Sequence, residues 1–396
     1  MKKIELLAPA GNLTKLKTAL IYGADAVYIG GKAFSLRARA NNFTLDDLKE
    51  GVEFAHNLGK KVYVTMNVVA REKDYSDYDL EEYLKYLSSI NVDGIICSSM
   101  YIASTIINKF PNMEAHLSTQ ASSLNSESVK FYSTLGIKRV VLAREASIDD
   151  IRTISASTNT ELEVFIHGGM CSSISGRCML SNYFVNRDAN RGGCAHSCRW
   201  NYDLFDVRGR KLNGKSYLNI ASKDLCAIEF IKDLIEAGVS SLKIEGRMKS
   251  EYYIASIVKT YRSLIDDIYS GKTIDYDYYR DELAKAENRL TSHGFLSGRL
   301  TINEQLYDSC DHPTKEFVGL VLDYKDGIAK LEQRNYFKIG DELEFFGPNH
   351  PNFSLKLEAM TNEKNEGISV APHPKEIIYI SVPFTLDVGD MVRVKK

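Results

Sequence analysis

Long apolar runs are missing from this sequence. No run of about 18 apolar residues occurs, so we expect no membrane-spanning helix and no membrane partner. The short apolar stretch that follows Met1 is interrupted by Glu5, which a secretory signal does not allow. These absences predict a cytoplasmic protein.

A charge excess of one sign is also missing, and cysteines are few. Lys and Arg number 50 against 52 Asp and Glu, for a formal net charge of −2. This balance excludes general attraction to nucleic acid, although a local basic patch is compatible with it.

The 7 cysteines are an odd number in a chain of 396 residues. That favours a metal or catalytic use of some thiols over a disulfide framework.

The common catalytic signatures are absent, apart from one misleading match. H-E-x-x-H, G-x-S-x-G and G-x-G-x-x-G do not occur, which removes the usual protease and dinucleotide-binding signals. Residues 209–216 match the P-loop pattern in letters, but a P-loop is followed by a helix, and residues 217–220 are typical of a strand. A β-hairpin with glycine turns explains the same letters.

Apolar runs alternate with amphipathic segments through the first 250 residues. Helices are expected at 13–22, 45–58, 80–87, 100–108, 127–135 and 148–154. The eight apolar runs between these helices are rich in β-branched residues and do not alternate with polar ones, which is typical of parallel strands buried on both faces. The pattern predicts an α/β fold with a TIM-like (β/α)8 barrel, and a doubly wound open sheet is the alternative. The strands are expected at 4–8, 26–29, 62–66, 94–97, 114–118, 139–142, 162–166 and 241–244.

The regular alternation breaks once and then ends. About 75 residues separate the last two predicted strands, and such long insertions are usually functional. Six of the 8 prolines follow residue 312, where short strand-like runs alternate with glycine turns. We expect a barrel at 1–265 with a Cys-rich insertion at 167–240, a helical connection at 266–312 and a small β-barrel domain at 313–396.

Four cysteines lie within 28 residues of the insertion: Cys171, Cys178, Cys194 and Cys198, spaced C-x6-C-x15-C-x3-C. Zinc sites usually pair cysteines more tightly, whereas iron–sulfur ligation tolerates wide spacing. The spacing favours a 4Fe-4S cluster, with structural zinc or no metal as the alternatives. Cys97, Cys226 and Cys310 are not expected to be ligands.

The insertion is locally basic and aromatic. Residues 177–215 hold eight Arg and Lys against three Asp, a surplus of five, with aromatic residues between them. Such a mixture suits phosphate contact and base stacking, and a solvated loop is the alternative. The expected RNA-binding residues are Arg187, Arg191, Arg199 and Trp200.

Polar residues also gather at the ends of the predicted strands, which would place them at one mouth of a barrel. We take His167, Glu245, Asn67 and His116 as catalytic candidates. Cations there suit a carboxylate-bearing small molecule. The candidates for holding it are Arg144, Lys243 and Arg247.

Several segments of the chain resemble the U32 peptidase family: EVFIHGGMC at 163–171, SGRCMLS at 175–181, LAPAGN at 7–12, GADAVY at 23–28 and KIEGR at 243–247. The resemblance extends over essentially the whole chain, including the small C-terminal β-barrel. The family is named for reported collagenase activity, but other members are oxygen-independent hydroxylases that carry a 4Fe-4S cluster.

The insertion and the C-terminal barrel are most similar to the family's tRNA branch. That similarity implies prephenate-dependent hydroxylation of the wobble uridine to 5-hydroxyuridine, with prephenate as the oxygen-donating co-substrate. It further implies binding of the tRNA anticodon stem-loop, and it allows a paralogous protein partner. The alternatives are a collagenase-like peptidase and a zinc-stabilised RNA-binding module without catalysis.

Overall fold

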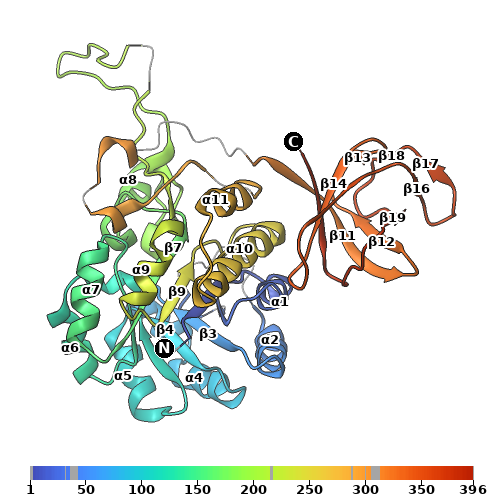
Figure 1. Cartoon of the computed structure of the whole chain (residues 1–396). Coiled ribbons are helices and arrows are strands. Elements are labelled where there is room, and N and C mark those ends of the chain that lie inside the picture. The colour runs from blue at the N-terminus through green and yellow to red at the C-terminus, as the bar shows by residue number, and fades with distance from the viewer. Residues whose placement is uncertain are drawn as a thin grey trace.

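The eight predicted strands form a closed parallel barrel (Figure 1). The computed structural model describes residues 3–31, 33–35, 43–214, 217–286, 289–298, 300–304 and 313–395. Each strand pairs in parallel with the next along the chain, and β9 closes the ring by pairing with both β1 and β7. The TIM-like barrel is therefore confirmed, and the open-sheet alternative is wrong. The barrel strands are β1 (Glu5–Pro9), β2 (Ala26–Ile29), β3 (Lys61–Met66), β4 (Gly94–Cys97), β5 (Glu114–Leu117), β6 (Arg139–Val141), β7 (Glu161–Gly168) and β9 (Ser241–Ile244).

Helices surround this ring and bury their apolar stripes against it. Several begin at side-chain caps that satisfy the first backbone amides, such as the capping boxes of Thr44 and Ser147. The main helices are α1 (Leu13–Ile21), α2 (Leu45–Asn57), α4 (Leu80–Ser89), α5 (Met100–Lys109), α6 (Ser126–Thr134), α7 (Ile148–Ser157), α9 (Ile231–Glu236) and α10 (Glu251–Tyr269). Helix α10 runs through residue 265, where we expected the barrel domain to end, and α11 (Tyr276–Ala284) packs against it.

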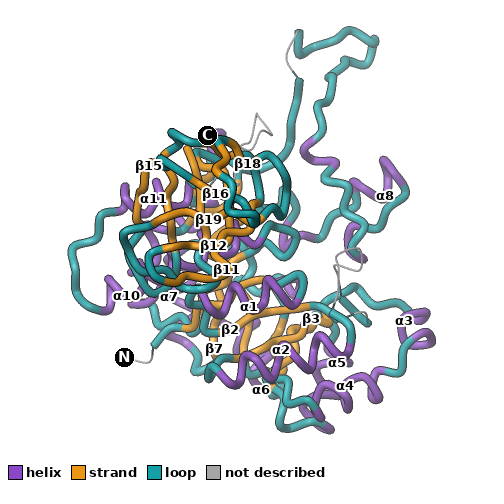
Figure 2. Tube along the Cα trace, turned by 90° about the vertical axis from the view of Figure 1, so that its right-hand side faces the viewer, coloured by secondary structure: helices purple, strands orange, loops and turns teal. Residues whose placement is uncertain are grey.

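The expected insertion after β7 is built mainly of short turns. It contains η2 (Ile174–Gly176), α8 (Leu180–Val185), η3 (Ala189–Arg191), η4 (Ser197–Arg199) and a short strand, β8 (Asp224–Cys226), that returns antiparallel to β7. Between η4 and β8, Tyr202 pairs with Leu218 and Phe205 with Lys211. This antiparallel pairing confirms a hairpin in place of a P-loop. Figures 1 and 2 show the hairpin standing away from the barrel.

The C-terminal part is an antiparallel β half-barrel with its own apolar core. Its strands are β11 (Lys315–Lys325), β12 (Ile328–Gln333), β13 (Phe337–Lys338), β14 (Glu342–Phe346), β15 (Phe353–Lys356), β16 (Met360–Thr361), β17 (Gly367–Ile368), β18 (Val370–Ala371), β19 (Ile377–Ser381) and β20 (Met391–Lys395). The remaining short elements lie near the barrel: α3 (Glu72–Asp77), β10 (Thr291–Ser292), η1 (Thr119–Ala121), η5 (Ile228–Phe230), η6 (Gly294–Ser297) and η7 (Ile302–Glu304).

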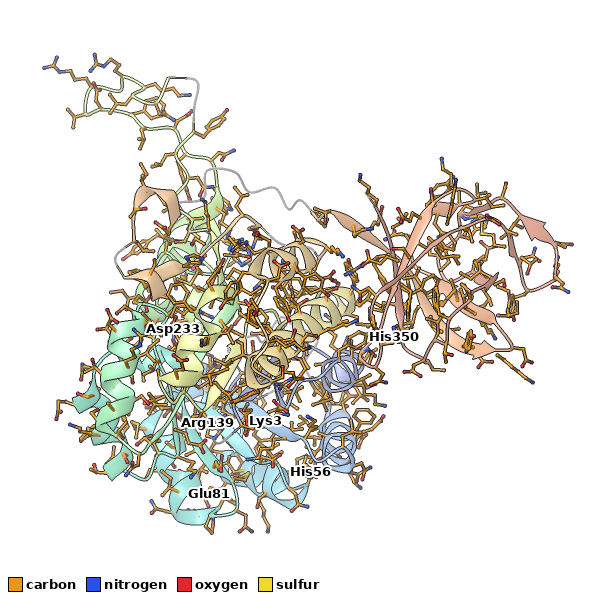
Figure 3. The ribbon with its side chains drawn as sticks, in the orientation of Figure 1. Lys3, His56, Glu81, Arg139, Asp233 and His350 are labelled. Atoms are coloured by element: carbon orange, nitrogen blue, oxygen red, sulfur yellow. The ribbon has the colours of Figure 1, made fainter. Side chains whose placement is uncertain are left out.

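The half-barrel is packed firmly onto the (β/α)8 barrel. Phe346 belongs to the barrel's apolar cluster, and the Tyr22 hydroxyl donates to the carbonyl of Gly389 at 2.9 Å. Arg393, 1% exposed, donates to Glu344 at 2.5 Å and to Glu282 of α11 at 2.8 Å. Figure 3 shows His350 at this junction. Ionic and apolar contacts together fix the half-barrel beside α10 and α11.

Among the described helices, none combines the length and the apolarity needed to cross a lipid bilayer.

Candidate functional site

The cysteine segment begins where β7 ends, at the carboxyl edge of the barrel. Gly168 has φ of +101°, and a Cβ there would lie 2.5 Å from the carbonyl oxygen of Glu245. Only glycine allows the chain to leave β7 so close to the loop that follows β9. The sequence thereby brings the cysteine segment and the loop after β9 together at one edge of the barrel.

Hydrogen-bond donors face three of the four thiols. The backbone amides of Ser173, Leu180 and His196 each donate to the sulfur of the cysteine two residues earlier, all at 3.4 Å. At the fourth thiol, the Ser172 side chain lowers the pKa of Cys198, although burial outweighs this effect. Donors aimed at sulfur favour the thiolate, which is the form that binds metals.

The four thiols are also electrostatically close. Burial raises the pKa of Cys171, and the nearby thiolates of Cys178 and Cys194 raise it further. The pKa of Cys198 is raised mainly by burial, and the charges of Cys171 and Cys194 add to this. The fold therefore gathers all four predicted ligands into one locality.

The donor set is four thiols, which either a 4Fe-4S cluster or a structural zinc ion can take. No group of three His, Cys, Asp or Glu side chains in the described part of the chain is placed to hold one metal ion. A zinc ion needs four ligands converging at about 2.0–2.3 Å. A 4Fe-4S cluster takes one thiolate at each of four separate irons, so its ligands stand further apart.

Arg144 lies near both the thiols and the mouth of the barrel. Its guanidinium lies 3.9 Å from the ring centre of Phe165, and Nη2 is 3.4 Å from the Glu245 carboxylate. Its positive charge also lowers the pKa of Cys171, although burial outweighs this effect. Arg144 and Glu245 thus lie between the cysteine segment and the barrel interior. Asn67 stands directly after β3 on the same edge.

Arg247 is a buried cation at this edge. It is 4% exposed, and Nη1 donates to the hydroxyls of Ser35 and Thr65, both at 3.3 Å. Gly30 makes room for it, since a Cβ there would lie 2.2 Å from Nη2. A guanidinium is also a group that binds carboxylates through paired, charge-assisted hydrogen bonds.

Lys243 and His116 lie deeper than we expected. The Lys243 ammonium donates to Glu163 at 2.6 Å, and both side chains are at most 5% exposed. His116 is fully buried beside the Tyr63 ring and lies 2.9 Å from Glu114, the first residue of β5. Burial lowers its pKa and keeps the ring neutral. The expected position of these two residues at the mouth is wrong, because strand side chains that point inward fill successive layers of a barrel.

This deeper layer is an ionic network centred on Arg139, which is labelled in Figure 3. Arg139 contacts Glu5 at 2.6 Å, Glu161 at 2.9 Å and Glu163 at 3.3 Å. Burial raises the pKa of Glu163, but the charges of Lys243 and Arg139 outweigh this and lower it. The network holds the barrel together and satisfies its buried charges.

His167 faces away from the mouth. An extra residue in β7 shifts the register between Phe165 and His167, and the His167 ring contacts Tyr253 and Tyr261 of α10. Its Nδ1 lies 3.2 Å from the Tyr261 hydroxyl. Burial, with a smaller effect of Lys249, lowers the pKa of His167 to about 3. A neutral, enclosed imidazole of this kind packs the barrel against α10, and a catalytic role for His167 stays a prediction.

Two of the expected RNA-binding cations have internal partners. Arg191 binds Asp74 of α3 through both terminal nitrogens at 2.5 Å, and Arg199 lies 3.4 Å from buried Asp224. Both carboxylates lie outside residues 177–215, for which we counted a surplus of five positive charges. That surplus therefore overstates the positive charge that the folded insertion presents to a partner. The RNA contact by Arg191 and Arg199 stays a prediction, and each of these two arginines already has an internal carboxylate partner.

Other groups of the insertion are open to a partner. Arg187 donates to the carbonyl of Cys194 at 3.4 Å and has no carboxylate partner among the described residues. Trp200 is 38% exposed, and its ring lies 6.2 Å from that of Phe184, which is 52% exposed. Phe184 and Arg208 belong to the basic and aromatic set of the insertion that the sequence indicated, although we did not single them out as binding residues, and Arg208 is exposed on the hairpin.

The fold and the site define a (β/α)8-barrel protein with a thiol-rich segment at the carboxyl ends of its strands, where barrel active sites lie. The chain belongs to peptidase family U32. The family model matches residues 11–305, and the model of the family's C-terminal domain matches residues 313–393.

Its relatives carry different functional names. A tRNA hydroxylation protein P1 of Bacillus subtilis is 45% identical over 99% of this chain and 95% of the relative. A 23S rRNA 5-hydroxycytidine C2501 synthase of Escherichia coli is 37% identical over 74% of this chain and 43% of the relative. A collagenase of Porphyromonas gingivalis is 33% identical over 91% of this chain and 90% of the relative.

Proposed function

We propose that this protein is an RNA-modifying hydroxylase whose substrate is tRNA, and that it converts the wobble uridine to 5-hydroxyuridine with prephenate as the hydroxyl source. The observation that carries the proposal is the full-length similarity to a protein named for tRNA hydroxylation, combined with the four gathered thiols. The similarity to an rRNA hydroxycytidine synthase supports RNA hydroxylation as the wider activity.

Cys171, Cys178, Cys194 and Cys198 would hold a 4Fe-4S cluster. The amide donors at three of the sulfurs and the Ser172 side chain at the fourth support this ligand set. When bound, such a cluster would supply electron transfer. The chain's own contribution is to orient the four thiolates and to place Arg144 beside Cys171.

Prephenate carries two carboxylates, and two guanidinium groups at the mouth suit it. Arg247 Nη1 donates to the hydroxyls of Ser35 and Thr65, and Arg144 Nη2 lies 3.4 Å from the Glu245 carboxylate. A bound carboxylate would gain charge-assisted hydrogen bonds from either arginine. Lys243 is left out of this proposal because Glu163 already neutralises it in the barrel interior.

The anticodon stem-loop would meet the outer face of the insertion. Exposed Phe184 and Trp200 offer rings on which unpaired bases stack, and Arg187 and Arg208 offer charges for phosphates. Stacking beside Cys198 would bring a nucleobase close to the thiol site.

The collagenase-like relative makes peptidase activity the competing function. A peptidase needs a free nucleophile or an activated water. The sequence has no signature of either, and in our proposal the four clustered thiols are occupied by iron.

Analysis of tRNA from a deletion strain tests the proposed function. The strain should lack 5-hydroxyuridine and nucleosides derived from it, as measured by mass spectrometry. A wild-type copy should restore them, Cys178→Ala should not, and the matched control Cys226→Ala should. Unchanged tRNA in the deletion strain, together with gelatin cleavage by protein free of contaminating proteases, would instead support the peptidase.

A further inference from the structure

The cysteine segment extends over a large part of the barrel rim. It leaves the barrel at the end of β7, and the amide of Ser175 donates to Glu145, in the loop after β6, at 3.0 Å. Its turn η2 packs against η1 in the loop after β5. Further along, Arg191 and Asp188 contact the residues that follow β3. In the ring order β7-β6-β5-β4-β3-β2-β1-β9, β3 stands opposite β7. The segment therefore spans the mouth from one side to the other.

Two crossed ion pairs fasten the far end of this segment. Arg191 binds Asp74 through two bonds of 2.5 Å, and Arg71 binds Asp188 at 2.5 Å. Each side thus supplies one arginine and one aspartate. We call Arg71, Asp74, Asp188 and Arg191 the rim clamp.

Backbone contacts reinforce the rim clamp. The amide of Val69 donates to the carbonyl of Asn190 at 3.3 Å, and Arg191 Nη1 donates to the carbonyl of Val69 at 3.0 Å. The Asp74 side chain is 14% exposed and that of Arg191 is 27% exposed, so the pair is partly shielded from water. A bidentate pair of this kind fixes orientation as well as distance.

The rim clamp is connected to Cys194 through the backbone of Gly193. The amide of Gly193 donates to the carbonyl of Asp188 at 2.7 Å, and a Cβ at Gly193 would lie 2.6 Å from that same oxygen. Cys194 follows at once. A shift of Asp188 or Arg191 would therefore move Cys194 with it.

We propose that the four residues of the rim clamp are positioning residues, which hold the thiol site across the barrel mouth and thereby against Arg144 and the bound co-substrate. This inference rests on the proposed function, because it assigns the clamp a role in hydroxylation. The clamp touches neither substrate nor thiols, so its loss should act on turnover through the placement of Cys194.

Arg191→Glu breaks one pair and keeps Asp74, which also caps α3. Arg71→Glu breaks the other pair, and Arg191→Lys keeps the charge but loses the bidentate geometry. Lys73→Glu is the matched control, because Lys73 lies on the same helix and its ion-pair partner among the described residues is exposed Asp77 within α3. Iron per chain and the thermal midpoint identify variants that are folded and loaded.

Hydrogen exchange and steady-state hydroxylation of tRNA give two independent readouts. Arg191→Glu and Arg71→Glu should each raise exchange at Val69 and across 186–193 at least tenfold. They should lower kcat at least tenfold while KM for tRNA changes less than threefold. Arg191→Lys should fall between wild type and Arg191→Glu, and Lys73→Glu should match wild type.

Two results would overturn the inference: unchanged exchange in both glutamate variants, or raised exchange with an unchanged kcat in loaded protein. If the wild type itself hydroxylates no RNA, the proposed function and the clamp's catalytic role fail. Exchange would still show whether the clamp holds the segment, so the two failures are distinguishable.

Discussion

Replacing Lys243 by methionine separates a structural lysine from a substrate-binding one. The change leaves the Glu163 carboxylate, 0% exposed, without its 2.6 Å partner. Breaking a buried ion pair by removing one member costs roughly 3–5 kcal/mol. Arg139 still contacts Glu163 at 3.3 Å, so we expect the lower end, about 3 kcal/mol. At about 2–4 °C per kcal/mol for a domain of this size, the midpoint should fall by roughly 6–12 °C.

Thermal unfolding followed by circular dichroism measures this shift, with iron content and hydroxylation rate measured on the same samples. The double variant Lys243→Met with Glu163→Gln removes both charges, so it should recover most of the stability. It should also keep its hydroxylation rate, because neither group touches the co-substrate in our proposal. If the free energy of unfolding of Lys243→Met lies within about 1 kcal/mol of wild type and the variant nevertheless loses hydroxylation, then Lys243 binds substrate. Its assignment to a purely structural ion pair would then be wrong.

Three further outcomes follow from individual side chains. Burial raises the pKa of Glu344, but nearby cationic side chains outweigh this and hold the pKa at about 2, below its ordinary 4.5. The ionised carboxylate therefore stabilises the fold fully above pH 4.5, and this stabilisation is lost as the pH falls towards 2. Below pH 4.5 the thermal midpoint should drop more steeply in wild type than in Glu344→Gln. Reversing the charges of Arg187 and Arg208 together should reduce the slope of log affinity for tRNA against log salt concentration by about 1.5, because two phosphate contacts are lost. Reversing the charge of Lys49 should leave the slope unchanged. Equal slopes for wild type and both variants would place the RNA elsewhere. Because the pKa of His167 is about 3, His167→Gln should keep the shape of the pH–rate profile, and the loss of one limb of that profile would make His167 a proton-transferring group.

The barrel could be predicted from the sequence because each strand is a short run of β-branched and other apolar residues. The predicted strands at 26–29, 94–97 and 241–244 match β2, β4 and β9 residue for residue. Burial on both faces of a parallel sheet imposes this pattern locally. The fold class therefore needed no information about distant contacts.

The site could be predicted only where its residues are close together in the sequence. The four cysteines lie within 28 residues of one insertion, so the sequence alone indicates that they form one group. The partner of Arg191 is Asp74, 117 residues earlier, and no local pattern announces that pair. The extra residue before His167 reverses the face of its side chain, and the sequence does not reveal where a bulge falls. Long-range ion pairs and register shifts are therefore the features of this site that the sequence does not reveal.

RNA hydroxylation by a cluster on the four cysteines is tested most directly in a purified reaction. Anaerobically prepared protein is incubated with prephenate and unmodified tRNA, and 5-hydroxyuridine is measured by mass spectrometry. We predict about four irons and four sulfides per chain and a product that depends on prephenate. Cys178→Ala should lose both the iron and the product. Stoichiometric zinc without sulfide, or fully loaded protein that forms no 5-hydroxyuridine, would contradict the proposed function.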